Sequence, residues 1–350
     1  MIDTTTVQEI GAAESIADCI RRVVGGEALT IADMRLAVEA IVDGDATPAQ
    51  IGALLAALAT RGETPDELAG AAAALRERMV AVPSSREPLL DVCGTGGDRS
   101  GSFNISTAVA FVAAGAGAAV AKHGNRAMSS RCGSADVLSA LGVRIDAPAA
   151  VSTRALDEIG IAFLFAQAHH PAMRAVAPAR REIGIRSIFN LVGPLANPAR
   201  AARQVVGVAD RQAVRTVAEA LCRLGSERAA AVRGLDGMDE VSLSGPTGVV
   251  EWTGSRIVEY EIDPSALGLA RRAVPALRGG DAKENAGIVR AVLAGCAGPH
   301  RDVVALNAAL ALVVAGIAAD LRDGLRRAEA SIDSGAAAAK LDGLVRVTAP

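Results

Sequence analysis

Residues 89–98, LLDVCGTGGD, decide the fold class of this chain. The first five are a short, mostly apolar run that is typical of a buried strand, and glycines follow directly. Glycine has no Cβ atom, so the turn at Gly94, Gly96 and Gly97 lets backbone amides approach an anion closely. The turn has neither the GxGxxG spacing of a dinucleotide-binding fold nor the GK[ST] of a P-loop. Taken alone, it fits an anion-binding loop and a tight strand-to-helix turn about equally well.

The segments that follow extend this strand and loop into an alternating pattern. Residues 105–114 predict a helix and residues 118–121 a second strand, so the order is that of a βαβ unit. Further strands are predicted at 162–165, 205–208 and 229–232, with helical segments between them. Most of the chain is therefore expected to be α/β, with a mostly parallel central sheet flanked by helices.

The first 80 residues predict helices instead of strands. Thr47 and Thr64 each precede a proline, with Gln50 and Glu67 at the capping-box position, so a helix is expected to begin at each place. Their short connection predicts an αα-hairpin, whose apolar face must be covered by a second domain or a second subunit. The proline-rich segment 171–198 interrupts the later alternation, and we expect it to cross back to this helical block.

The composition limits the class of protein. A chain of 350 residues is long enough for two or three domains, and 51% hydrophobic residues can form a large core. A net charge of −3 gives no global basic surface, so nucleic acid is not an expected partner. The apolar stretch 303–319 is interrupted by Asn307 and falls short of the roughly 20 residues that a membrane span needs, so a buried core helix is predicted and no membrane partner.

Two features predict a cytoplasmic protein. The five cysteines are scattered without metal-ligand spacing, which indicates reduced thiols. Residues 1–13 lack the basic and apolar regions of a signal peptide.

The helix after the glycine-rich loop opens with polar residues. A helix N-terminus offers free amides and a partial positive charge, and Asn104, Ser106 and Thr107 add side-chain donors for a phosphate. A serine hydroxyl such as that of Ser106 can also ligate Mg²⁺. Ordinary N-capping would explain these residues if the loop did not precede them. Together, the loop and the helix start indicate a pyrophosphate site.

The segment 122–130, KHGNRAMSS, follows a predicted strand at the sheet edge where α/β proteins bind ligands. Lys122, Arg126 and several hydroxyls suit phosphate or ribose oxygens. His123 and Asn125 could hydrogen-bond a second substrate. A polar capping loop is the alternative, but caps do not need so many anion-binding side chains.

Asp239 and Glu240 are adjacent carboxylates that follow a predicted strand. Such a pair can ligate one or two Mg²⁺ ions, because Mg²⁺ prefers a few carboxylates together with waters and substrate phosphates. A solvated acidic loop is the alternative interpretation. Beside a pyrophosphate site, the pair becomes the predicted metal site.

The segment 169–174, HHPAMR, precedes Arg180 and Pro194. Arg180 could pair a substrate carboxylate in a bidentate fork. His169 and His170 lack a third ligand at zinc spacing, so zinc is not expected. The other basic residues of this region are interpreted as a solvated helix face: Arg174, Arg181 and Arg186.

In this order, these residues resemble the anthranilate phosphoribosyltransferase family. The resemblance covers nearly the whole chain, and the combination of GTGGD, KHGNRA and GPLANP, with GGDAKENA at 279–286, is specific although each piece alone is not. It implies a nucleoside phosphorylase/phosphoribosyltransferase-like fold with the active site in the cleft between two domains. A helical domain of residues 1–82 plus about 170–198 would form a homodimer. An α/β domain of 83–169 plus 199–350 would bind phosphoribosyl pyrophosphate.

The resemblance also implies roles for individual residues. The residues expected to bind phosphoribosyl pyrophosphate are Gly94, Gly97, Asp98, Ser102, Asn104, Ile105, Ser106, Thr107, Lys122, His123, Gly124, Asn125, Arg126, Ala127, Met128, Ser129, Ser130 and Ser134. Those expected to contact anthranilate or shape its entry path are Gly94, Asn125, Arg180, His123, His170 and Pro194. Ser106, Asp239 and Glu240 are expected to hold Mg²⁺, with two ions per subunit.

Three positions depart from the family pattern. Arg99 stands where the family usually has Gly, and Ser102 where it has Thr, so a hydroxyl is kept at position 102. Cys132 stands where Ser is common.

The implied reaction joins the amine of anthranilate to C1 of the phosphoribosyl group in tryptophan biosynthesis. Two other functions are compatible with parts of the pattern. A pyrimidine-nucleoside phosphorylase-like enzyme would need a different phosphate-binding loop near position 94, and the KHGNRA segment argues against it. A non-catalytic nucleic-acid-binding relative would have a basic surface and would have lost Asp239 and Glu240, which are present.

Overall fold

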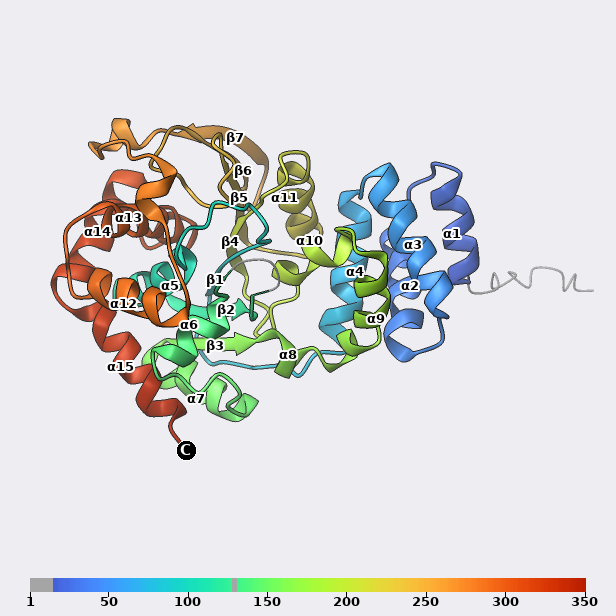
Figure 1. The fold of residues 1–350 in the computed structure, drawn as a ribbon, viewed down its shortest axis with the longest axis horizontal. Coiled ribbons are helices and arrows are strands. Elements are labelled where there is room, and N and C mark those ends of the chain that lie inside the picture. Colours follow the sequence, from blue (N-terminus) through green and yellow to red (C-terminus); the bar gives the residue numbers. More distant parts are fainter. Residues whose placement is uncertain (1–14, 128–130) are drawn as a thin grey trace, which may run out of the picture.

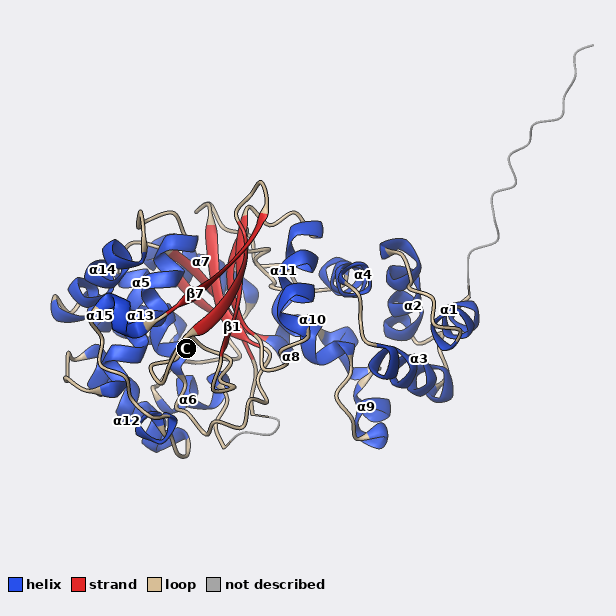
Figure 2. Ribbon diagram, turned by 90° about the horizontal axis from the view of Figure 1, so that it is seen from above, coloured by secondary structure: helices blue, strands red, loops and turns tan. Residues whose placement is uncertain are grey.

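The computed structural model describes residues 15–127 and 131–350, and within them a seven-stranded sheet has the order β3-β2-β1-β4-β5-β6-β7 (Figures 1 and 2). The strands β1 to β5 pair in parallel, whereas β6 and β7 extend the β5 edge as antiparallel strands. Their bounds are β1 (Leu89–Gly94), β2 (Ala119–Gly124), β3 (Ile161–Phe165), β4 (Arg203–Gly207), β5 (Arg228–Gly234), β6 (Thr247–Trp252) and β7 (Ile257–Ile262).

Each strand predicted from the sequence is confirmed, with bounds that differ by a few residues. Strands β6 and β7 were not predicted from the sequence. In β7, Glu259 and Glu261 alternate with partly buried residues, so the strand lacks the continuous apolar run by which the inner strands were recognised. The predicted α/β class with a mostly parallel sheet is confirmed.

One face of the sheet is covered by α5 (Ile105–Gly115) and by helices from the C-terminal third of the chain (Figure 2). Among these, α13 (Pro299–Val314) is buried from Val303 to Val314 and packs against α5 and β4, which confirms the predicted core helix. No helix in the described residues is long and apolar enough to cross a membrane. The other helices on this side are α6 (Ser134–Ala140), α12 (Ala282–Leu293), α14 (Leu321–Asp333) and α15 (Ala336–Thr348), and α7 (Ala149–Ile159) packs beside β3.

The N-terminal block consists of α1 (Ile16–Val24), α2 (Ile31–Asp43), α3 (Pro48–Arg61) and α4 (Pro65–Glu77). The predicted capping boxes at Thr47 and Thr64 are both present. The predicted αα-hairpin is wrong, because α3 packs mainly on α1 while α4 packs on α2 and on α11 (Ala213–Arg223). Buried Glu67, in the first turn of α4, ties this helix to the segment before α2, since it accepts a hydrogen bond from the Leu29 amide (2.9 Å). Its carboxylate also pairs with Arg61.

The proline-rich segment 171–198 crosses back to this block, as expected (Figure 1). After α8 (Ala166–His169) and a 3₁₀ turn at Pro171–Arg174, helix α9 (Ala177–Ile183) packs on α3. Helix α10 (Ile188–Leu195) packs on α4. A hydrophobic core made by α1–α4 and this returning segment continues onto α11 and the adjoining face of β4 and β5, so the helical block is packed directly against the sheet side of the molecule.

Candidate active site

Strands β1, β2, β4 and β5 end at one edge of the sheet, and each ends in a glycine: Gly94, Gly124, Gly207 and Gly234. The chain runs from β1 outward to β3 and then returns to β4 on the other side of β1, so the sheet order reverses between β1 and β4. Open α/β sheets bind ligands at such a reversal, beyond the carboxyl ends of the strands. The loops with the predicted motifs therefore meet at this edge.

The glycine-rich loop after β1 contacts the predicted metal carboxylates. Gly96 and Gly97 have positive φ values of 67° and 84°, which glycine adopts without strain. The Gly96 amide donates to Asp239 Oδ2 at 2.9 Å, and the Asp239 amide lies 3.4 Å from Asp98 Oδ2. A Cβ atom at Gly94 would lie 2.9 Å from Asp239 Oδ2. Residues separated by more than a hundred positions are thus in direct contact.

The start of α5 contacts the second carboxylate. The Ser106 amide donates to Glu240 Oε1 at 3.1 Å. The Lys122 ammonium donates to Ser106 Oγ at 3.3 Å and to the Val92 carbonyl at 2.7 Å. Lys122 is buried, and burial lowers its pKa, while the nearby carboxylates of Asp91 and Glu240 act in the opposite direction. One predicted phosphate donor, one predicted metal ligand and Lys122 therefore converge.

The carboxylates of this site are crowded. Burial, together with the neighbouring charge of Asp98, raises the pKa of Asp239 to about 7, while the Gly96 amide opposes the shift. Burial and the charge of Asp239 raise the pKa of Glu240 well above its usual range, with Lys122 in opposition. Like charges held together in this way fit a divalent cation, which removes their repulsion. Within the described ranges, no group of three or more His, Cys, Asp and Glu side chains is arranged to hold a metal ion.

The two carboxylates occupy donors that were predicted to hold phosphates. Glu240 takes the Ser106 amide, and Asp239 takes the Gly96 amide. An anionic ligand that uses these amides must displace the carboxylates. A metal ion would give the displaced carboxylates a new partner, so the geometry links cation binding to anion binding.

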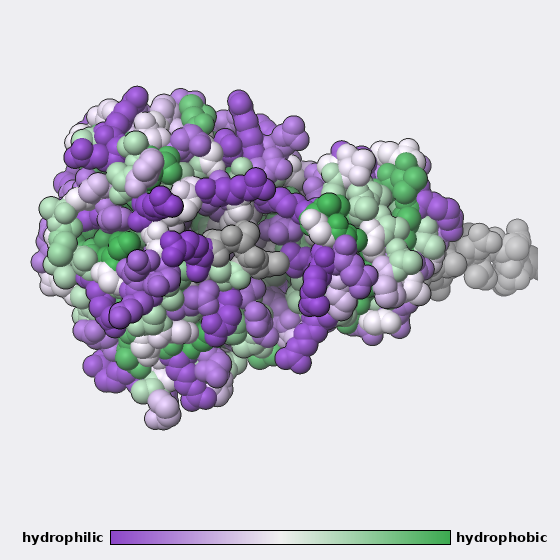
Figure 3. All heavy atoms as spheres, viewed as in Figure 1, coloured by the Kyte–Doolittle hydropathy of each residue, from purple (hydrophilic) through white to green (hydrophobic). Residues whose placement is uncertain are grey.

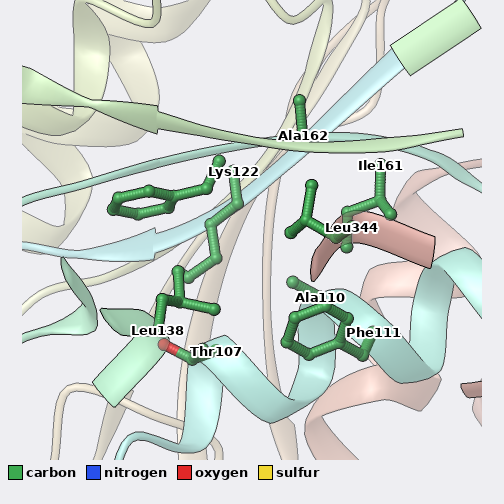
Figure 4. Close-up of a pocket in the computed structure, with 9 residues that line it drawn as sticks. Thr107, Ala110, Phe111, Lys122, Leu138, Ile161, Ala162 and Leu344 are labelled. Carbon is green, nitrogen blue, oxygen red and sulfur yellow. The ribbon is translucent and has the colours of Figure 1, made fainter. Parts of the chain in front are cut away.

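Two predicted phosphate ligands have side chains that do not face the loop. Asn104 makes no side-chain cap of α5, contrary to its sequence pattern, because its amide bonds to the Cys132 carbonyl (3.2 Å) and to Asn285 (2.9 Å). The Thr107 hydroxyl is buried without a hydrogen-bond partner in the described chain, and it lines a cavity of ≈ 10 Å³ beneath α5 with Phe111 and Lys122 (Figure 4). Both residues were assigned as donors because a helix start usually exposes its polar side chains.

Helix α5 also uses its first free amides internally. The amide of buried Ile105 donates to the Phe103 carbonyl (2.8 Å), and the amides of Thr107 and Ala108 lie 3.2 Å from the Asn104 carbonyl.

The loop after β2 folds around Asp136. The Asp136 carboxylate accepts from the amides of Ala127 (3.0 Å) and Gly133 (2.9 Å) and pairs with Arg126 at 2.8 Å. The Asn125 carbonyl accepts from the Ser134 hydroxyl at 3.2 Å. A Cβ atom at Gly124 would lie 2.2 Å from that hydroxyl oxygen and 2.8 Å from Phe163 Cε2, so a larger residue there would displace both side chains. The predicted residues Met128, Ser129 and Ser130 lie outside the described residues.

His123 and His170 are brought together, with ring centroids 5.2 Å apart. Both rings are buried, and in neither does Nε2 have a hydrogen-bond partner among the described residues. Burial lowers the pKa of His170 to about 4 and that of His123 well below its usual range, so both rings are neutral at pH 7. The adjacent His169 instead bonds to the Val80 carbonyl through Nδ1 at 2.8 Å.

The remaining predicted anthranilate contacts lie in the returning segment. The Arg180 guanidinium of α9 lies over the Phe189 ring at 5.9 Å, and burial lowers its pKa. Pro194 is buried in α10, and its carbonyl accepts from Gln204 at 3.0 Å. On the side of the molecule seen in Figure 3, many hydrophilic residues are exposed along the junction between the helical block and the α/β part.

The departures from the family pattern have visible consequences. Arg99 has a φ of 59°, the left-handed region that favours the glycine usual at this place. The Ser102 hydroxyl accepts from Ser100 at 3.1 Å, and its backbone forms a β-bridge with Arg278. Burial raises the pKa of the Cys132 thiol to about 11, so it stays neutral, and its carbonyl accepts the Asn104 bond.

A buried carboxylate that was not predicted from the sequence supports this edge of the sheet. Asp91, in β1, accepts from the His123 amide (3.0 Å) and from the side chains of Asn197 (2.8 Å) and Gln204 (3.4 Å). Burial raises its pKa, and Lys122 opposes the shift. A carboxylate inside an otherwise apolar strand was the available signal, since buried charges need partners.

Arg186 was interpreted as part of a solvated helix face. It is exposed, but its guanidinium nitrogen is 3.5 Å from where a Cβ atom of Gly97 would lie. The returning segment therefore reaches the glycine-rich loop, which the linear pattern could not indicate.

Comparison with known proteins agrees with this arrangement. Residues 86–338 match the model of the glycosyl transferase family, a/b domain, and residues 17–79 match that of the glycosyl transferase family, helical bundle domain. The chain is 53% identical to the anthranilate phosphoribosyltransferase of Azorhizobium caulinodans over 96% of this chain and 97% of the relative. It is also 53% identical to that of Moorella thermoacetica over 93% and 96%.

Two solved structures share the whole architecture. The anthranilate phosphoribosyltransferase of Thermus thermophilus superposes with a TM-score of 0.90 at 44% identity, over 95% of this chain and 99% of that one. The enzyme of Saccharomyces cerevisiae in complex with PRPP and Mg gives a TM-score of 0.86 at 27% identity, over 95% and 97%. The resemblance found in the motifs therefore extends to the full length and the tertiary structure, and this chain belongs to the anthranilate phosphoribosyltransferase family.

Proposed function

We propose that this chain transfers the 5-phosphoribosyl group from phosphoribosyl pyrophosphate to the amine of anthranilate, in tryptophan biosynthesis, with Mg²⁺ held by Ser106, Asp239 and Glu240. One observation carries the proposal: the amides of Gly96 and Ser106 bond to the carboxylates of Asp239 and Glu240 at the sheet reversal. Anion donors and cation ligands are adjacent there, as a metal-bound pyrophosphate requires.

The glycine-rich loop and the α5 start hold the pyrophosphate. The amides of Gly96 and Ser106 become its donors once the carboxylates turn away, and Lys122 supplies a buried positive charge. Preorganised donors in a site that excludes water stabilise charge that develops in the transition state, which is usually the largest catalytic contribution.

Ser106, Asp239 and Glu240 would hold Mg²⁺, with two ions per subunit, and the metal would neutralise negative charge on the pyrophosphate. The raised pKa values of Asp239 and Glu240 fit this role, because a cation stabilises their ionised forms. The complex of the Saccharomyces cerevisiae relative with PRPP and Mg supports it.

The acceptor site lies on the helical side. Arg180 pairs the anthranilate carboxylate, Asn125 holds its polar edge near Gly94, and His123, His170 and Pro194 form the wall of its path. The two histidines are neutral at pH 7, so they form a wall without charge beside an aromatic ring. A Saccharomyces cerevisiae relative solved in complex with 4-fluoroanthranilate supports an anthranilate site in this architecture.

The reaction requires orientation more than proton removal. The amine of anthranilate is neutral at pH 7 and has a lone pair, so it attacks C1 without a general base. The C1–N bond forms, the bond from C1 to the pyrophosphate oxygen breaks with its electron pair leaving on pyrophosphate, and the nitrogen then releases one proton to water. In well-aligned systems, holding both reactants in line lowers the activation barrier by about 7–11 kcal/mol.

The same proposal includes the organisation of the protein. Residues 1–82 with about 170–198 form the helical domain, residues 83–169 with 199–350 form the substrate-binding α/β domain, and the cleft between them closes on the substrates. The exposed apolar side chains Val24, Ile31 and Leu36 on α1 and α2 support a homodimer formed through the helical domain. The location is cytoplasmic.

The test is the double variant Asp239→Asn with Glu240→Gln, matched by Asp342→Asn on the exposed surface of α15. The purified protein is mixed with anthranilate, phosphoribosyl pyrophosphate and Mg²⁺, and loss of anthranilate fluorescence is followed. The double variant should lose turnover and its Mg²⁺ dependence, whereas Asp342→Asn should match the wild type. Unchanged Mg²⁺ dependence in the double variant would show that the metal assignment is wrong. A wild type that cleaves uridine with phosphate but ignores anthranilate would favour the nucleoside phosphorylase alternative.

A further inference from the structure

The motif GGDAKENA at residues 279–286 lies against residues 101–103, between the glycine-rich loop and α5, although none of the roles above uses it. The Gly279 amide donates to the Gly101 carbonyl at 2.9 Å, and the Phe103 amide donates to the Leu277 carbonyl at 3.1 Å. A Cβ atom at Gly279 would lie 2.7 Å from the Phe103 Cα, so only glycine permits this approach. The segment therefore forms a rigid backing for the residues just before α5.

Asn285, in α12, connects this segment to the start of α5 by hydrogen bonds. Its side chain is 2% exposed. Its Oδ1 accepts from the Gly280 amide at 2.7 Å, and its Nδ2 donates to Asn104 Oδ1 at 2.9 Å. Asn104 Nδ2 donates in turn to the Cys132 carbonyl at 3.2 Å. One buried amide thus connects the GGDAKENA segment, the α5 start and the loop after β2.

Asn307, in α13, holds the loop after β5 that contains Asp239 and Glu240. Its side chain is 4% exposed in a helix that is otherwise apolar from Val303 to Val314. Its Oδ1 accepts from the Val241 amide at 2.8 Å, and its Nδ2 donates to the Val241 carbonyl at 2.8 Å and to the Val303 carbonyl at 2.9 Å. Both backbone groups of the residue after Glu240 are therefore fixed by one side chain.

The chemistry of the amide explains why asparagine stands in these places. Each position needs an acceptor atom and a separate donor atom on one short side chain, and asparagine has both, whereas a hydroxyl has a single oxygen for the two roles. Leucine would leave buried backbone groups unpaired, and aspartate would lose the donor. A polar residue in the apolar core is otherwise destabilising, so its presence in α13 requires a compensating role.

We propose that Asn285 and Asn307 are positioning residues for the two halves of the pyrophosphate site. Asn285 fixes Asn104 and the α5 amides, and Asn307 fixes the backbone that carries Asp239 and Glu240. The proposal rests on the function proposed above for the adjacent loops. It assigns the GGDAKENA segment to the site through the hydrogen bond from Asn285 to Asn104.

The test compares Asn285→Leu and Asn307→Leu with Ser331→Ala. Ser331 is a matched control, because it is also buried and bonds to the Val112 carbonyl (2.8 Å) at the far end of α5. Calorimetry measures binding of inorganic pyrophosphate with Mg²⁺, which is independent of turnover. Steady-state kinetics measure the Michaelis constants of both substrates and the half-saturating Mg²⁺ concentration. Hydrogen exchange measures protection of the peptides around Gly280 and Val241.

Each asparagine variant should weaken pyrophosphate binding by about tenfold or more, the change expected for loss of one buried hydrogen bond. The Michaelis constant for anthranilate should stay within about twofold of the wild type, well below a tenfold change. Asn307→Leu should mainly raise the half-saturating Mg²⁺ concentration and lower the hydrogen-exchange protection of the peptide around Val241. Asn285→Leu should mainly raise the Michaelis constant for the phosphoribosyl donor and lower the hydrogen-exchange protection of the peptide around Gly280. Ser331→Ala should alter melting temperature alone.

Normal pyrophosphate affinity in folded Leu variants would overturn the proposal, as would an equal loss in Ser331→Ala. Should a Leu variant fail to fold, Asn285→Ser or Asn307→Ser, which keep one hydroxyl, should give a smaller loss of the same kind, and wild-type affinity in them would equally overturn it. If the wild type did not turn over anthranilate, the proposed function would be refuted. The positioning roles would still be tested, because pyrophosphate binding in the variants is measured separately.

Discussion

Gly207→Ala is the sharpest perturbation that the geometry offers. Gly207 ends β4 at the sheet reversal, and a Cβ atom there would lie 1.6 Å from the Asp239 carbonyl oxygen and 2.6 Å from its carbon. Cβ atoms essentially never approach closer than 3.0 Å, so the backbone at Asp239 must move by about 1.4 Å. Because this backbone carries both predicted metal carboxylates, the whole pair moves with it.

A misplacement of about 1 Å in a catalytic site can cost about a hundredfold in rate. We therefore expect kcat/KM to fall by at least about a hundredfold, with a raised half-saturating Mg²⁺ concentration. The cost in stability should be about 1–3 kcal/mol, as for other overpacked sites. Anthranilate fluorescence follows the rate, and thermal denaturation shows whether the variant is folded.

Gly248→Ala is the matched control in the same sheet. The nearest atom to a Cβ there is the Arg233 carbonyl oxygen at 3.9 Å, an ordinary contact, so activity should be unchanged. Gly94→Ala should give a smaller loss than Gly207→Ala, because the added methyl meets the Asp239 side chain at 2.9 Å and the side chain can rotate. The reasoning is refuted if folded Gly207→Ala keeps wild-type turnover and Mg²⁺ dependence.

Further predictions concern the acceptor side and the helical domain. Arg180→Ala should raise the Michaelis constant for anthranilate by about tenfold or more, as expected for a lost charged hydrogen bond, and that of the phosphoribosyl donor much less. Arg181→Ala is the control. A larger rise in the Michaelis constant of the phosphoribosyl donor than in that of anthranilate would count against the assignment. The pKa of His170 falls from 6.5 to about 4 on folding, so its neutral form contributes stability above pH 6.5 that is lost as the pH falls toward 4. In urea denaturation, this group should make the free energy of unfolding about 3 kcal/mol smaller at pH 4 than at pH 7. His170→Gln should remove this part of the pH dependence of stability, and an unchanged pH dependence in the variant would contradict the prediction. Leu36→Asp on exposed α2 should convert a dimer to monomers in sedimentation velocity, and an unaltered dimer would exclude this face.

Local patterns were sufficient for the elements and for the choice of motifs. The apolar run ending at Gly94 and the capping boxes at Thr47 and Thr64 depend on neighbours within a few residues, so they could be recognised in the linear chain. The pairing of α3 with α4 was predicted wrongly because packing partners depend on distant residues such as Glu67 and Leu29. Strand β7 was missed because its alternation of charged and partly buried residues lacked a continuous apolar run.

The site shows the same division. The sequence indicated Asp98, Ser106, Lys122 and the Asp239–Glu240 pair, since each residue type carries recognisable chemistry. Only the tertiary structure decided that the two carboxylates bond to the loop amides, that the Thr107 hydroxyl is turned inward, and that Asn285 and Asn307 fix the surroundings. The physical reason is that the sequence determines which groups exist and which local elements they join, whereas hydrogen-bond partners are set where parallel strands from distant segments end at a common edge.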